Sequence, residues 1–404
     1  MRDDVDKIVV LDPGMMIESG HHRPYNKAIE AACQEKGVAC SFMFSGQTPT
    51  ELWDDFENAS APFSFWHYEL HPDPVSGDLE EYIFKSQTMR ENLNEFLTPL
   101  TDSRTTVFMH TGKLYALFAL SMWQSSLPEG QKPHIFINFF DYAPSDLFQA
   151  CLKFAADFIK DDPRVFLLAG CKSVAEKISA FSGFRVRIMP APLTLGERSA
   201  LFRPEAEPVL GFVSEGRPEK NIHILAPAVR EYLCSGGKGR FHFQIVPTYK
   251  SVFETTNALR SLADDFPDRV EFEQGYVTTD RYYDILSGLD AILLPYTPAL
   301  YRSSGLVQEA LALGVSPLVV RGGSQMLEAA RIGAGFAMMT EPSVQALLEA
   351  IRGIVRDYAS LREKSVAASK QYRKYHSHSN LVDTLLFSDH SVTAEGMFQD
   401  SAPV

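Results

Sequence analysis

Short apolar segments alternate with helical segments along almost the whole chain of 404 residues, and this alternation constrains the fold more than any other feature. Residues 7–12 form a first apolar segment, a glycine-containing loop and a helical pattern over residues 25–36 follow, and residues 38–44 form a second apolar segment. This order predicts a βαβ unit, in which two parallel strands are joined by a helix that covers the sheet. The same rhythm predicts further strands at residues 105–110, 134–140, 164–169, 209–214, 241–247, 270–272, 291–294 and 317–320. It predicts helices at residues 79–97, 222–233, 282–287, 304–313 and 344–374, and another near residue 258.

The rhythm breaks between residues 189 and 208, where Pro190, Pro192, Pro204 and Pro208 lie in a polar stretch without apolar periodicity. Such a stretch is typical of an interdomain linker. We therefore expect an α/β protein with two Rossmann-like, doubly wound domains. The expected division is an N-terminal domain over residues 1–195, a linker over 196–207, a C-terminal domain over 208–375, and a C-terminal segment and tail over 376–404. Doubly wound domains bind ligands at the carboxyl ends of their strands, so the cleft between the two domains is the expected site.

The charge of the chain excludes some classes of function. Lys and Arg together number 38 against 51 Asp and Glu, which gives a formal net charge of −13 at pH 7. A nucleic-acid-binding protein needs a basic face to meet phosphates, so we expect no nucleic-acid partner. Anionic lipid headgroups are disfavoured for the same reason, and no apolar run reaches the roughly 18 residues of a membrane span. We expect no transmembrane segment and at most weak peripheral membrane contact.

Cysteine usage and the first residues indicate a cytoplasmic protein. The five cysteines form no C-x-x-C pair, which is typical of reduced, mostly buried thiols. The acidic residues 1–7 lead directly into the first strand without the pattern of a signal peptide. The H-E-x-x-H, P-loop and G-x-G-x-x-G motifs are also absent, so the common zinc, nucleotide-hydrolase and classical dinucleotide sites are not expected.

Residues 270–336 carry the most informative pattern. Residues 290–295 read DAILLP, a loop with Gly305 follows, residues 309–314 read EALALG, and residues 316–320 form a buried strand. This segment resembles the donor site of retaining, GT-B-fold glycosyltransferases of the group 1 (family 4-like) superfamily. The resemblance covers most of residues 209–340 in the order and spacing of its motifs. The first half of the chain matches only in its alternation of strands and helices. It implies the GT-B fold, in which two Rossmann-like domains face each other across a cleft.

The start of the helix that holds Glu309 is the expected donor site. Ser303, Ser304, Gly305 and Leu306 lie there, and the free backbone N–H groups and positive dipole end of a helix suit a diphosphate. The serine hydroxyls can cap the helix or contact phosphate oxygens. Glu309 can accept hydrogen bonds from two vicinal ribose hydroxyls, each worth roughly 1.5–3 kcal/mol. Without the surrounding pattern, the same residues would fit a plain N-cap and a solvated surface charge.

Two cations are expected to neutralise the diphosphate. Residues 211–220 read GFVSEGRPEK, which resembles the GR…K element of the family at the end of the first strand of the second domain. An arginine fork and a lysine ammonium there neutralise a leaving group without a metal, so Arg217 and Lys220 are catalytic candidates. Their spacing is shorter than is usual in the family. The resemblance also implies that Gly275 and Tyr276 line the nucleobase pocket.

A position eight residues before Glu309 departs from the family pattern. The family usually has E-x7-E, but the first glutamate is replaced here by Tyr301. Tyr301 and Arg302 can contact the sugar through a phenol and a guanidinium. The substitution leaves the donor sugar open, and it favours the alternative that the chain has lost turnover.

Polar residues after three predicted strands are candidates in the first domain. Gly20, His21 and His22 resemble the glycine-rich loop that approaches the donor phosphates, although the usual double glycine is missing. His110 stands where a histidine of the family hydrogen-bonds the donor sugar, and it is the third catalytic candidate. Asp141 is a candidate on the acceptor side, with a helix N-cap as its structural alternative.

Together these features predict a metal-independent, retaining glycosyltransferase, a hexosyl- or related sugar transferase. The expected partners are a nucleotide-sugar donor and a glycan, a lipid-linked saccharide or a small acceptor, as in polysaccharide biosynthesis. No D-x-D stands at a strand end, so no metal is expected, and because the nucleotide-sugar is a substrate no cofactor is expected either. Two alternatives stay open: a catalytically degenerate GT-B-like binding or scaffold protein, and a nucleotide-sugar epimerase.

Overall fold

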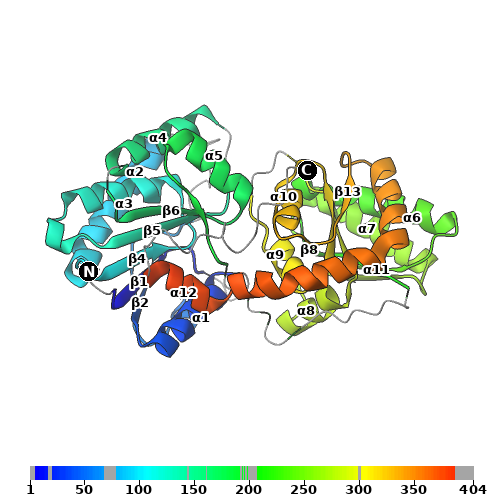
Figure 1. Ribbon diagram of the computed structural model, residues 1–404, viewed down its shortest axis with the longest axis horizontal. Helices are drawn as coiled ribbons and strands as arrows, with labels where there is room; N and C mark the ends of the chain where they lie inside the picture. Colours follow the sequence, from blue (N-terminus) through cyan, green and yellow to red (C-terminus); the bar gives the residue numbers. More distant parts are fainter. Residues whose placement is uncertain are drawn as a thin grey trace. The chain divides into compact units, whose positions relative to one another are not determined.

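The computed structural model divides into two compact units (Figure 1). It describes residues 5–16, 21–67, 79–142, 145–160, 162–191, 193, 195, 198, 207–298 and 302–386. Unit 1 comprises Met1–Thr194 and Tyr375–Met397, and unit 2 comprises Leu195–Lys374 and Phe398–Val404. Most of the linker predicted over residues 196–207 lies outside the described residues.

Unit 1 is built on a seven-stranded sheet in the order β3-β2-β1-β4-β5-β6-β7, and all its neighbouring strands are parallel. The strands are β1 (Lys7–Asp12), β2 (Ala39–Ser45), β3 (Ala59–Phe63), β4 (Thr105–Met109), β5 (His134–Phe139), β6 (Val165–Ala169) and β7 (Arg187–Ile188). The helices are α1 (His22–Lys36), α2 (Leu79–Asn92), α3 (Leu114–Ser126), α4 (Asp146–Ile159), α5 (Lys172–Ser182) and α12 (His378–Leu386). Because the connections are helices, both faces of the sheet are covered, as a parallel sheet requires.

The last helix of the chain completes unit 1. α12 packs beside α1, where Leu381, Val382 and Leu385 join the same core cluster as Ile29. In Figure 1 this red helix lies beside the blue α1. The sequence assigns residues 376–404 to a separate segment and tail, but residues 378–386 belong to the core of the first unit, and residues 387–404 lie outside the described residues.

Unit 2 repeats the architecture with a six-stranded parallel sheet in the order β10-β9-β8-β11-β12-β13. Its strands are β8 (Val209–Gly216), β9 (Arg240–Pro247), β10 (Val270–Gln274), β11 (Ala291–Leu294), β12 (Ser316–Val320) and β13 (Ala337–Met339). Its helices are α6 (Leu225–Cys234), α7 (Lys250–Asp265), α8 (Thr279–Gly288), α9 (Gly305–Ala312), α10 (Ser324–Arg331) and α11 (Val344–Tyr375), the last of which ends at the boundary with unit 1. Close packing at the sheet centre requires a glycine in β8, because a Cβ at Gly211 would lie 2.0 Å from the backbone oxygen of His242.

Each sheet contains a point at which the strand order reverses. In unit 1 the chain proceeds from β1 to β2 and β3, then returns to place β4 on the other side of β1. In unit 2 it proceeds from β8 to β9 and β10, then returns to place β11 beside β8. The loops after such a pair of strands diverge, and they leave a crevice at the carboxyl ends in which doubly wound sheets bind ligands. The predicted site residues follow these four strands or the elements next to them.

Most predicted strands and helices lie within a few residues of the observed ones. The helix predicted over residues 79–97 is α-helical only to Asn92 and continues as a π-helical turn over Leu93–Leu97. The five cysteines are free thiols, but only Cys33 and Cys171 are buried, so the expectation of mostly buried thiols is wrong. Among the described residues, none of the helices combines the length and apolar character needed to cross a membrane.

Candidate functional site

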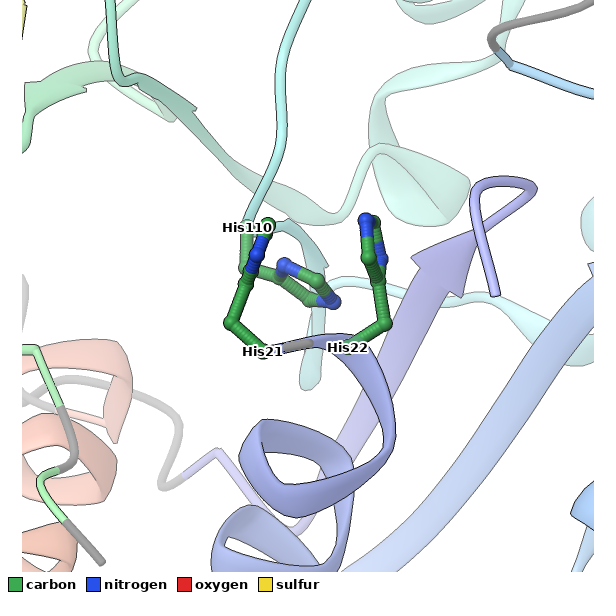
Figure 2. Close-up of side chains that lie close together, drawn as sticks. All are labelled: His21, His22 and His110. Carbon is green, nitrogen blue, oxygen red and sulfur yellow. The ribbon is translucent and has the colours of Figure 1, made fainter. Parts of the chain in front are cut away.

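Three histidines gather at the point of strand reversal in unit 1. His21 and His22 lie at the beginning of α1, and His110 directly follows β4. Figure 2 shows the three rings side by side, with His21 and His22 presented by the helix and His110 by the separate strand segment. One ligand atom from each ring can be chosen so that all three lie within 4.8 Å of one another. Two segments far apart in the sequence thus form one imidazole cluster.

The carboxylate of Asp12, at the end of β1, organises this cluster. One of its oxygens accepts hydrogen bonds from the backbone N–H of Gly14 at 3.1 Å and from Nδ1 of His22 at 2.7 Å. The other accepts a hydrogen bond from Nδ2 of Asn26 at 2.7 Å and lies 3.1 Å from Nε2 of His110. Burial alone would raise the pKa of Asp12, but the charges and hydrogen bonds of His22 and His110 hold it well below its usual value.

His110 is fixed from several sides. Its side chain is fully buried and its ring stacks on Tyr25 with 4.9 Å between centroids. Nδ1 lies 2.9 Å from the hydroxyl of Thr111, and the backbone oxygen of His110 accepts a hydrogen bond from Asn138 on β5 at 2.7 Å. A buried imidazole held by a carboxylate and a hydroxyl is preorganised rather than mobile.

The other candidates of unit 1 are His21, Asp141 and Gly20. His21 is exposed at the residue level, and burial of its ring together with the charges of His22 and His110 lowers its pKa to about 3. Its Nε2 lies 3.4 Å from the hydroxyl of Thr111. Asp141 pairs with Lys113 at 3.6 Å. Gly20 lies outside the described residues.

Arg217 and Lys220 follow β8 at the strand reversal of unit 2. Nε and Nη2 of Arg217 lie 2.7 and 2.5 Å from the same carboxylate oxygen of Glu215. The ammonium of Lys220 donates to the hydroxyl of Ser214 at 2.6 Å and to the backbone oxygen of Glu215 at 2.9 Å. Asn221 adopts a left-handed conformation, with φ of 48°, and ties this loop to β11 through the backbone oxygen of Pro295 at 2.9 Å.

Lys220 is the more strongly perturbed of the two cations. Its burial, with the nearby charges of Arg217 and Arg302, lowers its pKa to about 8, while Glu215 and Glu219 partly offset that shift. Arg302 therefore lies within electrostatic range of Lys220, although it follows a different strand. Two elements thus direct positive charge to one side of the sheet, where an anion would be stabilised.

Glu309 on α9 faces two tyrosines of α8. The phenols of Tyr282 and Tyr283 donate hydrogen bonds to its two carboxylate oxygens at 2.6 and 3.0 Å, respectively. Burial raises the pKa of Glu309, and these two hydrogen bonds only partly reverse that rise. Each carboxylate oxygen has a second lone pair, so the two phenols orient Glu309 without using its full capacity to accept hydrogen bonds.

Within the part of the chain that the structure describes, the beginning of α9 is open on its N-terminal side. Ser304 is the N-cap residue, yet its side chain makes no capping hydrogen bond. Gly305 is exposed, and a Cβ built there would meet no atom within 4 Å. The side chain of Leu306 is buried, so its backbone rather than its side chain is the part available to a ligand. Ser303 is half-buried.

The turn predicted to line the nucleobase pocket follows β10. Gly275 has φ of 98°, which favours glycine, and its backbone oxygen accepts a hydrogen bond from Nε2 of Gln244 at 2.6 Å. The next side chain, Tyr276, is 76% exposed. Tyr301, at the position that departs from the family pattern, lies outside the described residues.

Several residues of these clusters were missed by sequence reasoning. They are Asp12, Tyr25, Asn26, Thr111, Glu215, Tyr282 and Tyr283. Asp12 carried a usable signal, because it is an acidic residue that ends an otherwise apolar strand. The tyrosines carried none, since an aromatic pair on a helix is most often core.

Comparisons with known proteins address the fold. No family model matches the chain, and a search of curated proteins finds no match either. Among solved structures, HepE from Anabaena in complex with UDP is 13% identical and has a TM-score of 0.63 over 94% of this chain and 98% of that chain. A glycosyltransferase from Rickettsia africae is 12% identical, with a TM-score of 0.64 over 98% and 99% of the two chains. The N-terminal domain of a Candida albicans trehalose-6-phosphate phosphatase is 10% identical, with a TM-score of 0.67 over 95% and 97%.

These similarities extend over nearly the whole of each chain, so they include both α/β units of the present chain. At 10–13% identity they concern architecture and not residue roles. The predicted fold class is therefore confirmed: the chain has the GT-B fold of these glycosyltransferase structures.

Proposed function

We propose that this protein is a metal-independent, retaining glycosyltransferase that moves a sugar from a nucleotide-activated donor to an acceptor hydroxyl. The observation that carries the proposal is the arrangement after β8 and β11, where Arg217, Lys220 and Arg302 supply positive charge to one side of the sheet. The uncapped beginning of α9 belongs to the same loop as Arg302. The binding of UDP by HepE, which has the same fold, supports a nucleotide-sugar as the donor class.

Each residue of unit 2 has a proposed role that its chemistry suits. Arg217 and Lys220 neutralise the leaving diphosphate, while the backbone N–H groups of Gly305 and Leu306 donate to its oxygens. Glu309, oriented by two phenols, accepts hydrogen bonds from the ribose hydroxyls. The turn at Gly275 lies against the base.

Retention of configuration is proposed to follow from attack on the same face that the leaving group occupies. The departing diphosphate then helps to deprotonate the acceptor hydroxyl, so the protein has to position both substrates and stabilise phosphate charge. His110 is proposed to bind the donor sugar, His21 and His22 to approach the phosphates, and Asp141 to contribute on the acceptor side. The acceptor is proposed to be a glycan, a lipid-linked saccharide or a small molecule, and free thiols support a reducing, cytoplasmic location.

Calorimetric titration of the chain with UDP, ADP and GDP in EDTA tests the donor site. We expect at least one of these nucleotides to bind, and Arg217→Ala to weaken it at least tenfold, since a charge-assisted hydrogen bond contributes about 1.5–3 kcal/mol. The matched control is Arg356→Ala, because Arg356 is 74% exposed and pairs with its neighbour Asp357.

A second variant separates phosphate binding from a structural ion pair. Glu215 engages one edge of Arg217, so Glu215→Gln releases the guanidinium and should leave nucleotide affinity equal or higher. If Glu215→Gln weakens binding as much as Arg217→Ala does, the pair serves the fold and the proposed role of Arg217 fails.

Turnover distinguishes a transferase from a degenerate binding protein. Nucleotide-sugar hydrolysis or transfer across a panel of donors should be measurable in EDTA. Binding without turnover for any donor would favour the binding or scaffold alternative, and a strict need for a divalent metal would contradict the metal-independent mechanism.

A further inference from the structure

We propose that His21, His22 and His110 form a binding site for a divalent transition-metal cation, with Zn²⁺ as the type ion. Their ligand atoms already lie within 4.8 Å of one another, and the rings converge from two separate segments of unit 1 (Figure 2). Imidazole nitrogens suit Zn²⁺, Co²⁺, Ni²⁺ and Cu²⁺, whereas Mg²⁺ and Ca²⁺ prefer oxygen ligands. These are the same histidines that are proposed above to approach the donor, so the cation is proposed to bind them when no donor is present, and the transfer reaction itself uses no metal.

Asp12 supplies the outer support that histidine ligands need. Its carboxylate takes the hydrogen of His22 Nδ1 at 2.7 Å and lies 3.1 Å from His110 Nε2. A carboxylate at these nitrogens places the protons on them, and the lone pairs are then on Nε2 of His22 and Nδ1 of His110. Metal-bound histidines almost always donate the hydrogen of the other ring nitrogen to a carboxylate, a backbone carbonyl or water, which fixes the tautomer and the ring orientation.

The same contacts exclude Asp12 as a ligand. Its two oxygens accept three hydrogen bonds, from Gly14, His22 and Asn26, and one of them also lies 3.1 Å from Nε2 of His110, so little acceptor capacity remains for a metal ion. The carboxylate is also only 1% exposed, and its negative charge close to the rings stabilises a cation held by them. The arrangement has three neutral nitrogen ligands, one outer carboxylate and a remaining coordination position for water.

Binding requires a small contraction of the cluster. In a tetrahedral zinc site, Zn–N bonds of about 2.0–2.1 Å place neighbouring nitrogens about 3.4 Å apart. The two ligand nitrogens that lie farthest apart here, at up to 4.8 Å, must therefore approach each other by roughly 1.4 Å. His110 is fixed by Tyr25 and Asp12, whereas His21 lies at the exposed beginning of α1 and can rotate. The hydroxyl of Thr111, which contacts both His110 Nδ1 and His21 Nε2, is the group that the cation displaces.

The test is equilibrium dialysis of tag-free, chelator-treated protein against Co²⁺ and Zn²⁺ without nucleotide. Four-coordinate Co²⁺ is read by its visible d–d absorption, and Zn²⁺ by displacement of Co²⁺. The variants are His21→Ala, which alters an exposed ligand, and Asp12→Asn, which alters the outer carboxylate. The matched controls are His223→Ala, an exposed histidine of unit 2, and His242→Ala, a histidine that lies near the carboxylates of Glu271 and Glu273.

We expect one equivalent of metal in the wild type and in both controls. His21→Ala should lower affinity at least tenfold, and Asp12→Asn should lower it 10- to 100-fold, the range found for outer partners of histidine ligands. The proposal is overturned if the wild type shows no saturable binding, if His21→Ala binds as tightly as the wild type, or if His242→Ala abolishes the signal. Should Asp12→Asn fail to fold, His21→Ala decides alone. Since the assay contains no nucleotide, failure of the donor site would not change its outcome.

Discussion

Two carboxylates, the buried Asp12 and the half-buried Glu309, organise the candidate sites at the scale of single residues. Their pKa values shift in opposite directions, although loss of water around each group acts to raise both. Asp12 faces imidazoles, whose charged forms stabilise the carboxylate, whereas Glu309 faces phenols, which donate hydrogen bonds but carry no positive charge. The partners therefore decide the direction of each shift.

Lys220 provides a pH-dependent prediction. Its pKa of about 8 in the folded protein means that its positive charge is lost as the pH rises through 8, whereas an ordinary lysine stays charged to about 10.4. If diphosphate binding needs that charge, nucleotide affinity should fall about tenfold between pH 7 and pH 9. Calorimetric titration with UDP across this range measures the effect, because the terminal phosphate of UDP, with a second pKa of about 6, is mostly ionised at pH 7 and only gains negative charge at higher pH, which acts against the expected loss.

Lys220→Arg is the control for this prediction, since an arginine stays charged throughout. We expect the variant to bind UDP with an affinity that is nearly constant from pH 7 to pH 9. An equal decline in the variant and the wild type would assign the pH dependence to another group.

At the scale of elements, the reversal of strand order determines where polar residues meet. β1 and β4 are neighbours in space but lie more than ninety residues apart in the chain, and their carboxyl ends bring Asp12 and His110 together. β8 and β11 do the same for the loops that carry Lys220 and Arg302. Helix α12 contributes to packing instead. It covers α1, and in the described part of the chain none of its residues belongs to these polar clusters.

Leu381→Ala tests the contribution of α12 to unit 1. Leu381 is fully buried in the cluster with α1, so its truncation should cost about 2–5 kcal/mol of the free energy of unfolding. Asp383→Ala on the same helix removes a half-exposed ion pair with Lys36 and should cost at most about 1 kcal/mol. Urea denaturation monitored by fluorescence and circular dichroism compares them, and equal effects would show that α12 does not complete the core.

At the scale of the whole molecule, two α/β units divide the work of the proposed enzyme. The residues proposed for the base, the ribose and the neutralisation of the diphosphate belong to unit 2, and the imidazole cluster, which is proposed to approach the phosphates and the sugar, belongs to unit 1. The chain as a whole carries a net charge of −13, so an anionic donor has to be met by cations concentrated locally rather than by the average field.

Hydrogen exchange of the full chain with and without UDP tests this division. At a UDP concentration of about 100 times Kd, binding contributes about 2.7 kcal/mol, which slows exchange up to about 100-fold where opening disrupts the site. We expect protection over residues 214–221, 274–277 and 302–309, with little change in α12. Protection confined to unit 1 would contradict the proposed donor site.

Local patterns were sufficient to predict most elements of the fold. Apolar strands such as β1 and β12 are buried on both faces, and buried strands of a parallel sheet appear in sequence as continuous apolar runs. Helix α12 was missed for the opposite reason: it has nine residues, and an isolated helix of that length is marginal until long-range packing stabilises it.

The candidate sites could be predicted only in part. Arg217, Lys220 and Glu309 are predicted as site residues because they stand in an ordered motif that follows the ends of strands, and their roles stay predictions. The hydrogen bonds from Tyr282 and Tyr283 to Glu309 were not predictable, because they depend on how α8 packs against α9. The contact of Arg217 with Glu215, by contrast, joins residues two positions apart and is local.

The sequence by itself determined the α/β class, the two-unit organisation and the strands whose carboxyl ends bear polar residues, because these follow from periodicity and turn chemistry within short windows. The tertiary structure alone decided which of those ends meet. Convergence of His21, His22 and His110 on Asp12 depends on the strand order β2-β1-β4, which is set by long-range pairing. The return of α12 to the first unit has the same origin, since Leu381 is buried in a cluster with residues such as Ile29 that lie far earlier in the chain.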